Sequence, residues 1–93
     1  MQKMFRYKRG VKISYNKQGY VHFVSKRYAV LQGNKQKTIL EMCIQHGGEH
    51  WRALFEYITT DVSAEEVTQR HGITKPILYA MMRKYYKNFP EWI

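Results

Sequence analysis

The chain has 93 residues, enough for one domain that folds alone, and its composition is typical of a globular rather than a disordered protein. The net charge is +9, and the single cysteine excludes an intramolecular disulfide and favours a reducing, cytoplasmic location. No apolar run is long enough to cross a membrane, and the basic N-terminus lacks the apolar stretch of a secretory signal.

The charge is distributed very unevenly along the chain. Residues 1–40 contain ten Lys and Arg and no acid, residues 41–66 carry a net charge of −5, and residues 67–93 carry +4. Globular surfaces usually mix the two signs, so a long basic stretch favours a polyanionic partner such as a nucleic acid. We expect the acidic middle segment to face away from that partner.

The first predicted element is a β-hairpin within residues 5–28. Apolar and polar side chains alternate over residues 11–15, residues 16–19 carry a glycine-containing turn signal, and residues 20–24 are rich in β-branched and aromatic side chains. An isolated hairpin is marginally stable in water. Its apolar face is therefore expected to pack on the helical part of the chain or on a second protomer.

Basic residues flank or decorate this predicted hairpin, and a β-ribbon can enter a groove or lie along the phosphates of DNA. A hairpin with a merely solvated basic face is an equally supported interpretation. The candidate DNA contacts of this region are Lys8, Arg9, Lys12, Lys17, Lys26 and Arg27.

Helices are predicted for the rest of the chain. Asn34 is a suitable N-cap for a helix over Lys35–His46, which ends at the glycine pair 47–48. Residues Glu49–Thr59 place apolar side chains at intervals of three and four, which predicts an amphipathic helix. The expected fold class is α+β, mainly α, with a single domain over residues 1–93: a basic hairpin region (1–32) and a helical unit (33–93).

Two more helices are predicted between Ser63 and Lys87. Ser63 and Glu66 have the spacing of a capping box, which marks the start of the first. Gly72 ends that helix, because glycine adopts the left-handed turn conformation without steric cost. Thr74 can cap the second helix, and Pro76 falls in its first turn, where a missing N–H costs little.

The three predicted helices between Glu49 and Lys87 resemble the helix-turn-helix superfamily of DNA-binding domains. Thr68 stands where that superfamily usually has alanine, and residues 72–79 look like the turn and recognition-helix start of resolvases and transposases. With its preceding hairpin, the chain is similar to a variant of the winged-helix type. The positions that carry the resemblance are Val67, Gly72, Ile73, Leu78 and Met81.

The resemblance implies that the last helix enters the major groove of double-stranded DNA. Lys75 would contact guanine or phosphate, Tyr79 a phosphate or a thymine methyl group, and Arg83 and Lys84 the backbone. The candidate DNA contacts of this unit are Thr74, Lys75, Pro76, Tyr79, Arg83, Lys84 and Arg70.

The sequence therefore predicts a sequence-specific double-stranded DNA-binding protein. It would act as a transcriptional regulator or as an accessory protein at a replication, recombination or DNA-transfer origin. Dimerisation or tandem sites would supply specificity, because one such unit has a small footprint. The alternatives are an RNA-binding module that uses the basic hairpin and an adaptor that binds another protein.

Neither catalysis nor a cofactor is expected, because no nucleophile–base arrangement or phosphate-binding glycine loop stands out. The spacing of Cys43, His46 and His50, with Glu49 between the histidines, is suggestive of a metal site. The glycine pair 47–48 interrupts the helix that would align those ligands, and there is no second cysteine. We therefore expect no metal ion.

Overall fold

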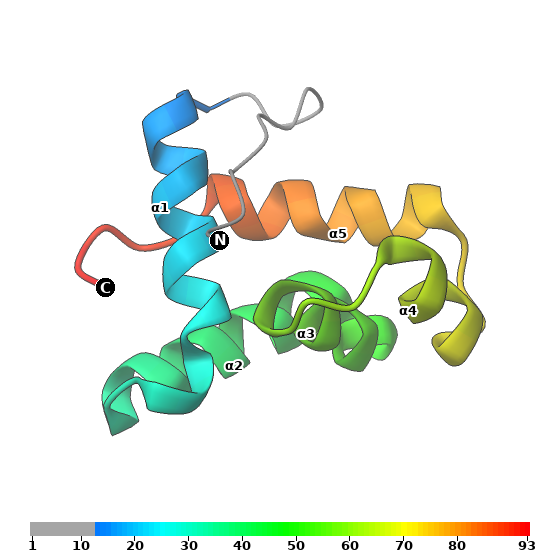
Figure 1. The fold of residues 1–93 in the computed structure, drawn as a ribbon, viewed down its shortest axis with the longest axis horizontal. Coiled ribbons are helices and arrows are strands. Elements are labelled where there is room, and N and C mark those ends of the chain that lie inside the picture. The colour runs from blue at the N-terminus through cyan, green and yellow to red at the C-terminus, as the bar shows by residue number, and fades with distance from the viewer. Residues whose placement is uncertain (1–12) are drawn as a thin grey trace.

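The computed structural model describes residues 13–93, which form α-helices and two short 3₁₀ helices and contain no strand. The elements are α1 (Tyr15–Lys26), η1 (Tyr28–Val30), α2 (Gly33–Gly47), η2 (Gly48–His50), α3 (Trp51–Thr59), α4 (Ala64–His71) and α5 (Lys75–Lys87). In Figure 1, α5 lies across α2 and α3, while α1 crosses near its C-terminal end and α4 lies near its N-terminal end.

The predicted β-hairpin is wrong, and with it the α+β fold class and the winged-helix variant. Residues 15–26, which include the expected turn and second strand, form α1 instead. Residues 1–12, and with them the predicted contacts Lys8, Arg9 and Lys12, lie outside the described part of the chain. Over residues 13–93 the fold is entirely helical.

The physical reason for α1 lies in its cap and its buried face. The Ser14 hydroxyl accepts a hydrogen bond from the Lys17 amide at 3.1 Å, which satisfies one of the free donors at a helix N-terminus. Gln18, Val21 and Ser25 are buried at intervals of three and four residues, so they form one helical face. Strand propensity is a weak preference, and packing of this face overrides it.

The other predicted helices are confirmed within one or two residues at their ends. α2 covers the predicted Lys35–His46 and ends at Gly47, before Gly48 with its positive φ of 54°. The predicted N-cap Asn34 is wrong, because the helix begins at Gly33 with Gln32 at the N-cap position. α3 begins at Trp51 rather than at Glu49, because residues 48–50 form η2. Gly47 allows the close approach of α2 and α3 at this connection, since a Cβ on residue 47 would lie 3.0 Å from the Trp51 Cβ.

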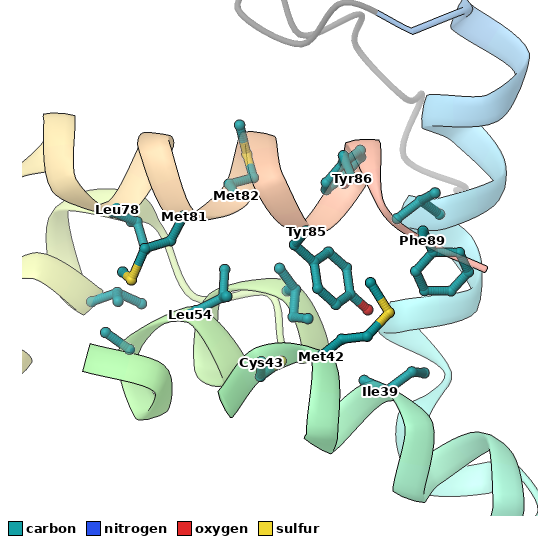
Figure 2. Close-up of a cluster of buried hydrophobic side chains, with 14 of the residues drawn as sticks. Ile39, Met42, Cys43, Leu54, Leu78, Met81, Met82, Tyr85, Tyr86 and Phe89 are labelled. Carbon is teal, nitrogen blue, oxygen red and sulfur yellow. The ribbon is translucent and has the colours of Figure 1, made fainter. Parts of the chain in front are cut away.

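All five α-helices contribute to one hydrophobic core. Figure 2 shows its centre, where Tyr85 points from α5 toward Met42 of α2, and Leu54 of α3 lies alongside. The phenol oxygen of Tyr85 also lies 2.8 Å from the hydroxyl of Ser25, a buried contact that joins α5 to α1. The buried apolar residues are Val21, Ile39, Met42, Cys43, Ala53, Leu54, Ile58, Val67, Ile73, Leu78, Met81, Met82, Tyr85, Tyr86, Phe89 and Ile93.

Candidate nucleic-acid interface

The turn between α4 and α5 forms at Gly72 as the sequence predicts, but Thr74, at the N-cap position of α5, makes no side-chain capping hydrogen bond. Ser63 caps α4, since its hydroxyl accepts a hydrogen bond from the Glu66 amide at 3.2 Å. Gly72 ends the helix in the left-handed conformation, with φ 65° and ψ 35°. Ile73 then turns into the core, and α5 begins two residues later. This short turn fixes the direction in which α5 leaves α4.

Thr68 is buried on the inner face of α4, where the resembled family usually has alanine. Its hydroxyl donates to the carbonyl oxygens of Ala64 at 2.8 Å and Glu65 at 3.0 Å. The hydroxyl therefore has partners on its own helix, and threonine is accommodated at this buried position.

One side of α5 faces the core and the opposite side faces solvent. Leu78, Met81, Met82, Tyr85 and Tyr86 are buried at helical spacing against the other helices. Ala80 is half-buried and lies near the middle of the outer side. The exposed residues of α5 and its cap are Thr74, Lys75, Pro76, Ile77, Arg83, Lys84 and Lys87. We call this set, with Ala80, the outer face of α5.

The outer face of α5 is purely cationic in its charged groups. Lys75, Arg83, Lys84 and Lys87 contribute four positive charges, and α5 contains no Asp or Glu. Within residues 13–93, no ion pair joins any of these four side chains to a carboxylate. Unpaired cations spaced along an exposed helix are suited to binding a row of phosphates.

Two predicted contacts of the helix-turn-helix unit lie elsewhere. Tyr79 is half-buried and packs against the core, and its proximity adds to burial in raising the pKa of Tyr57. Arg70 is exposed on α4, but its guanidinium pairs with the carboxylate of Glu56 on α3 and lies 3.8 Å from that of Glu66. These two residues are therefore less available to DNA than the outer face of α5.

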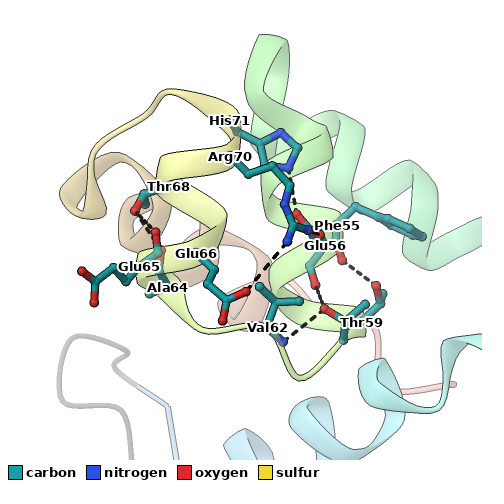
Figure 3. Close-up of polar contacts among 11 residues, drawn as sticks. Phe55, Glu56, Thr59, Val62, Ala64, Glu65, Glu66, Thr68, Arg70 and His71 are labelled. Carbon is teal, nitrogen blue, oxygen red and sulfur yellow. Dashed lines mark hydrogen bonds and ion pairs between the residues drawn. The ribbon is translucent and has the colours of Figure 1, made fainter.

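Glu56 is the centre of a charge cluster between α3 and α4, shown in Figure 3. One of its carboxylate oxygens pairs with Arg70, and the other lies 2.9 Å from His71 Nε2. Both partners belong to the last turn of α4, so the cluster fastens the C-terminal end of α4 to α3. The acidic side chain thus has a structural role between α3 and α4.

The predicted contacts on α1 have structural tasks as well. Lys26 Nζ donates to the carbonyl oxygens of Tyr57 at 2.9 Å and of Thr60, both at the C-terminal end of α3. Lys17 Nζ lies 3.5 Å from the carbonyl oxygen of Lys87, at the C-terminal end of α5. Free carbonyls at a helix C-terminus favour a cation, so both lysines serve as helix caps. Arg27 is exposed just beyond α1.

Lys87 and Ile77 were not among the predicted contacts. Both are exposed on the outer face of α5. Lys87 follows Arg83 by four residues, so helical periodicity from Arg83 could have identified it. Ile77 had no such signal, because an apolar residue in an amphipathic helix is first assigned to the core.

The residues considered for a metal site are not brought together. Cys43 is fully buried, and burial raises the pKa of its thiol to about 12. Gly48 ends the helix between His46 and His50. In the described part of the chain, no three His, Cys, Asp or Glu side chains form a group that could hold a metal ion.

His46 lies beside the outer face of α5. Burial lowers the pKa of its imidazole, and the positive charge of Lys84 lowers it further. His46 is therefore a natural probe of any anion that binds at Lys84.

Comparison of the chain with protein-family models, curated proteins and solved structures finds no match. Among residues 13–93, no helix combines the length and the apolar character that a membrane-spanning segment needs.

Proposed function

We propose that the chain binds double-stranded DNA, with α5 in the major groove. The observation that carries the proposal is the outer face of α5, where Lys75, Arg83, Lys84 and Lys87 lie without a carboxylate partner. The left-handed turn at Gly72 and the cluster around Glu56 support it, because the turn sets the direction of α5 relative to α4 and the cluster fastens α4 to α3. A recognition helix must be held rigidly to keep its register on the bases.

Phosphate neutralisation would supply most of the affinity, and the N-terminal half of α5 would read the bases. A homodimer on a symmetric site would increase the footprint. Use in transcriptional regulation, or at a replication, recombination or DNA-transfer origin, fits such a reader equally well. Selection of bound duplexes from a random pool tests the proposal. We expect an enriched motif, with dyad symmetry if the protein binds as a dimer, and recovery of no motif would contradict sequence-specific binding.

Matched charge variants test whether α5 carries the contacts. Each phosphate contact adds about 0.9 to the slope of log affinity against log salt, and about eightfold in affinity at roughly 0.1 M salt. The double variant Lys84→Gln/Lys87→Gln should therefore lower the slope by about two. The control Lys35→Gln/Lys37→Gln removes two lysines from α2 and should leave the slope unchanged.

Fluorescence anisotropy with a labelled duplex gives the affinities, and circular dichroism checks that each variant is folded. Equal losses for the two double variants would show that the attraction is diffuse and not centred on α5. Single-stranded RNA serves as the competitor, and stronger competition by RNA than by duplex DNA would contradict the proposal. Binding without steep salt dependence would also contradict it, and would favour a protein partner instead.

The imidazole of His46 provides an independent readout. Its pKa is lowered mainly by burial and in part by Lys84, so the imidazole stays neutral at pH values somewhat below the usual histidine pKa. A phosphate at Lys84 offsets the lysine charge, so duplex binding should raise the pKa of His46. Binding would then take up protons, and affinity should increase as the pH falls from above the His46 pKa of the complex to below that of the free protein. An NMR titration of His46 with and without duplex measures the shift, and an unchanged pKa would place the DNA elsewhere.

A further inference from the structure

The outer face of α5 is divided along its length. Its C-terminal half carries three cations, Arg83, Lys84 and Lys87, whereas its first two turns carry one, Lys75, followed by Pro76, Ile77 and Ala80. Pro76 and Ile77 are exposed, and Ile77 shows 40% of its surface to solvent. In helix-turn-helix proteins, the N-terminal half of the recognition helix is the part that contacts the base edges.

Hydrogen-bonding groups are scarce in this N-terminal half. Between residues 74 and 82 the polar side chains are Thr74, Lys75 and Tyr79; Thr74 and Lys75 lie at the very start of the helix, and Tyr79 is half-buried against the core. There is no Asn, Gln, Asp or Glu to accept from or donate to adenine and cytosine. An apolar surface in the major groove instead matches the C5-methyl group of thymine, which is the one apolar group on the base edges there.

We infer that α5 recognises thymine through its methyl group, with Ile77, Pro76 and Ala80 as the contact surface. This inference rests on the proposed function, because it assigns the base class that the same helix reads. The cations of the C-terminal half lie on the same side of α5, so a duplex held by its phosphates there would meet the apolar residues as well. That shared side favours DNA over a purely apolar partner as the occupant.

The test compares a selected duplex with the same duplex made with deoxyuridine, which lacks only the methyl group. Burying one methyl group is worth about fourfold in the dissociation constant, so two contacted thymines give about fifteenfold. We expect the deoxyuridine duplex to bind more weakly by such a factor. Restoring thymine at single positions should show which methyl groups are contacted.

Ile77→Ala separates the methyl contact from other effects of deoxyuridine on the duplex. This variant should bind the thymine duplex more weakly and should discriminate less between the two duplexes. Ile44→Ala is the matched control, because Ile44 is an isoleucine of α2 with a similar exposure of 46%. It should retain the full discrimination.

The outcomes distinguish this inference from the proposed function. Absence of binding to any duplex would overturn the proposed function itself. Equal binding of the thymine and deoxyuridine duplexes would overturn the methyl inference while leaving DNA binding intact. Full discrimination in Ile77→Ala would show that the methyl group acts through the duplex and not through this face. An equal loss of discrimination in Ile44→Ala would show that the loss is not specific to this face, and would also overturn the inference.

Discussion

Replacing Lys26 with methionine tests whether this lysine stabilises the fold or binds DNA. The substitution removes the ammonium group and keeps most of the aliphatic chain. In the structure Lys26 Nζ donates to the carbonyl oxygens of Tyr57 and Thr60 and lies 5.9 Å from the centroid of the Tyr57 ring. The variant therefore leaves the C-terminal end of α3 without its charged donor.

The expected loss is about 2 kcal/mol in the free energy of unfolding. Hydrogen bonds from charged donors are worth about 1.5–3 kcal/mol each. Water replaces part of that value here, because Lys26 is half-buried and Thr60 is exposed. In a domain of this size about 1 kcal/mol changes the melting temperature by about 4–8 °C, so the variant should melt about 8–16 °C lower.

Urea unfolding followed by far-UV circular dichroism measures the loss. The urea midpoint should fall with little change in the denaturant slope, which would indicate a change in stability alone. Arg27→Met is the control, because the neighbouring Arg27 is exposed. The reasoning is refuted if Lys26→Met keeps the wild-type midpoint and instead weakens duplex binding, which would return Lys26 to the DNA contacts.

Three further predictions concern the core. Tyr85→Phe leaves the buried Ser25 hydroxyl without its partner at 2.8 Å, so unfolding should cost about 1–2 kcal/mol less. The same urea titration should show partial recovery when Ser25→Ala is added, and an additive further loss would contradict the pairing. Gly47→Ala places a Cβ 3.0 Å from that of Trp51 and should destabilise by about 1–3 kcal/mol. In the matched Gly33→Ala the new Cβ meets no atom within 4 Å, so equal effects would argue against crowding. Folded protein should resist iodoacetamide at about pH 8, because the Cys43 thiol is buried with a pKa raised to about 12; rapid labelling without unfolding would contradict that burial.

The helices from α2 onward were predictable because their signals are local. The cap of α4 needs only Ser63 and the amide of Glu66, three residues apart. The turn needs only Gly72, whose left-handed conformation follows from the absence of a side chain. The residues that make such signals are neighbours in the sequence, so they can be recognised without knowledge of the fold.

The N-terminal helix was not predictable in the same way. Its buried face includes Gln18 and Ser25, polar residues that a hydrophobic pattern assigns to the surface. The partner of Ser25 is Tyr85, sixty residues later in the chain. The alternation that suggested strands is real, but which face is buried depends on these distant contacts.

The candidate site was predicted in part. Lys75, Pro76, Arg83 and Lys84 are exposed on the outer face of α5, where the prediction placed them. Lys17 and Lys26 were selected for their charge, yet their acceptors are main-chain carbonyls, which leave no mark in the sequence. A count of basic residues therefore overstates how many cations remain for a partner.

The two lysines of α1 also affect whether the segment from α3 to α5 could be used as an isolated fragment. Lys17 and Lys26 contact carbonyl oxygens at the C-terminal ends of α5 and α3, so α1 ties these two helices together. A fragment that starts at α3 would lose both caps, together with the Ser25 contact to Tyr85. A fusion protein designed to present the outer face of α5 should therefore include α1 and α2 as well.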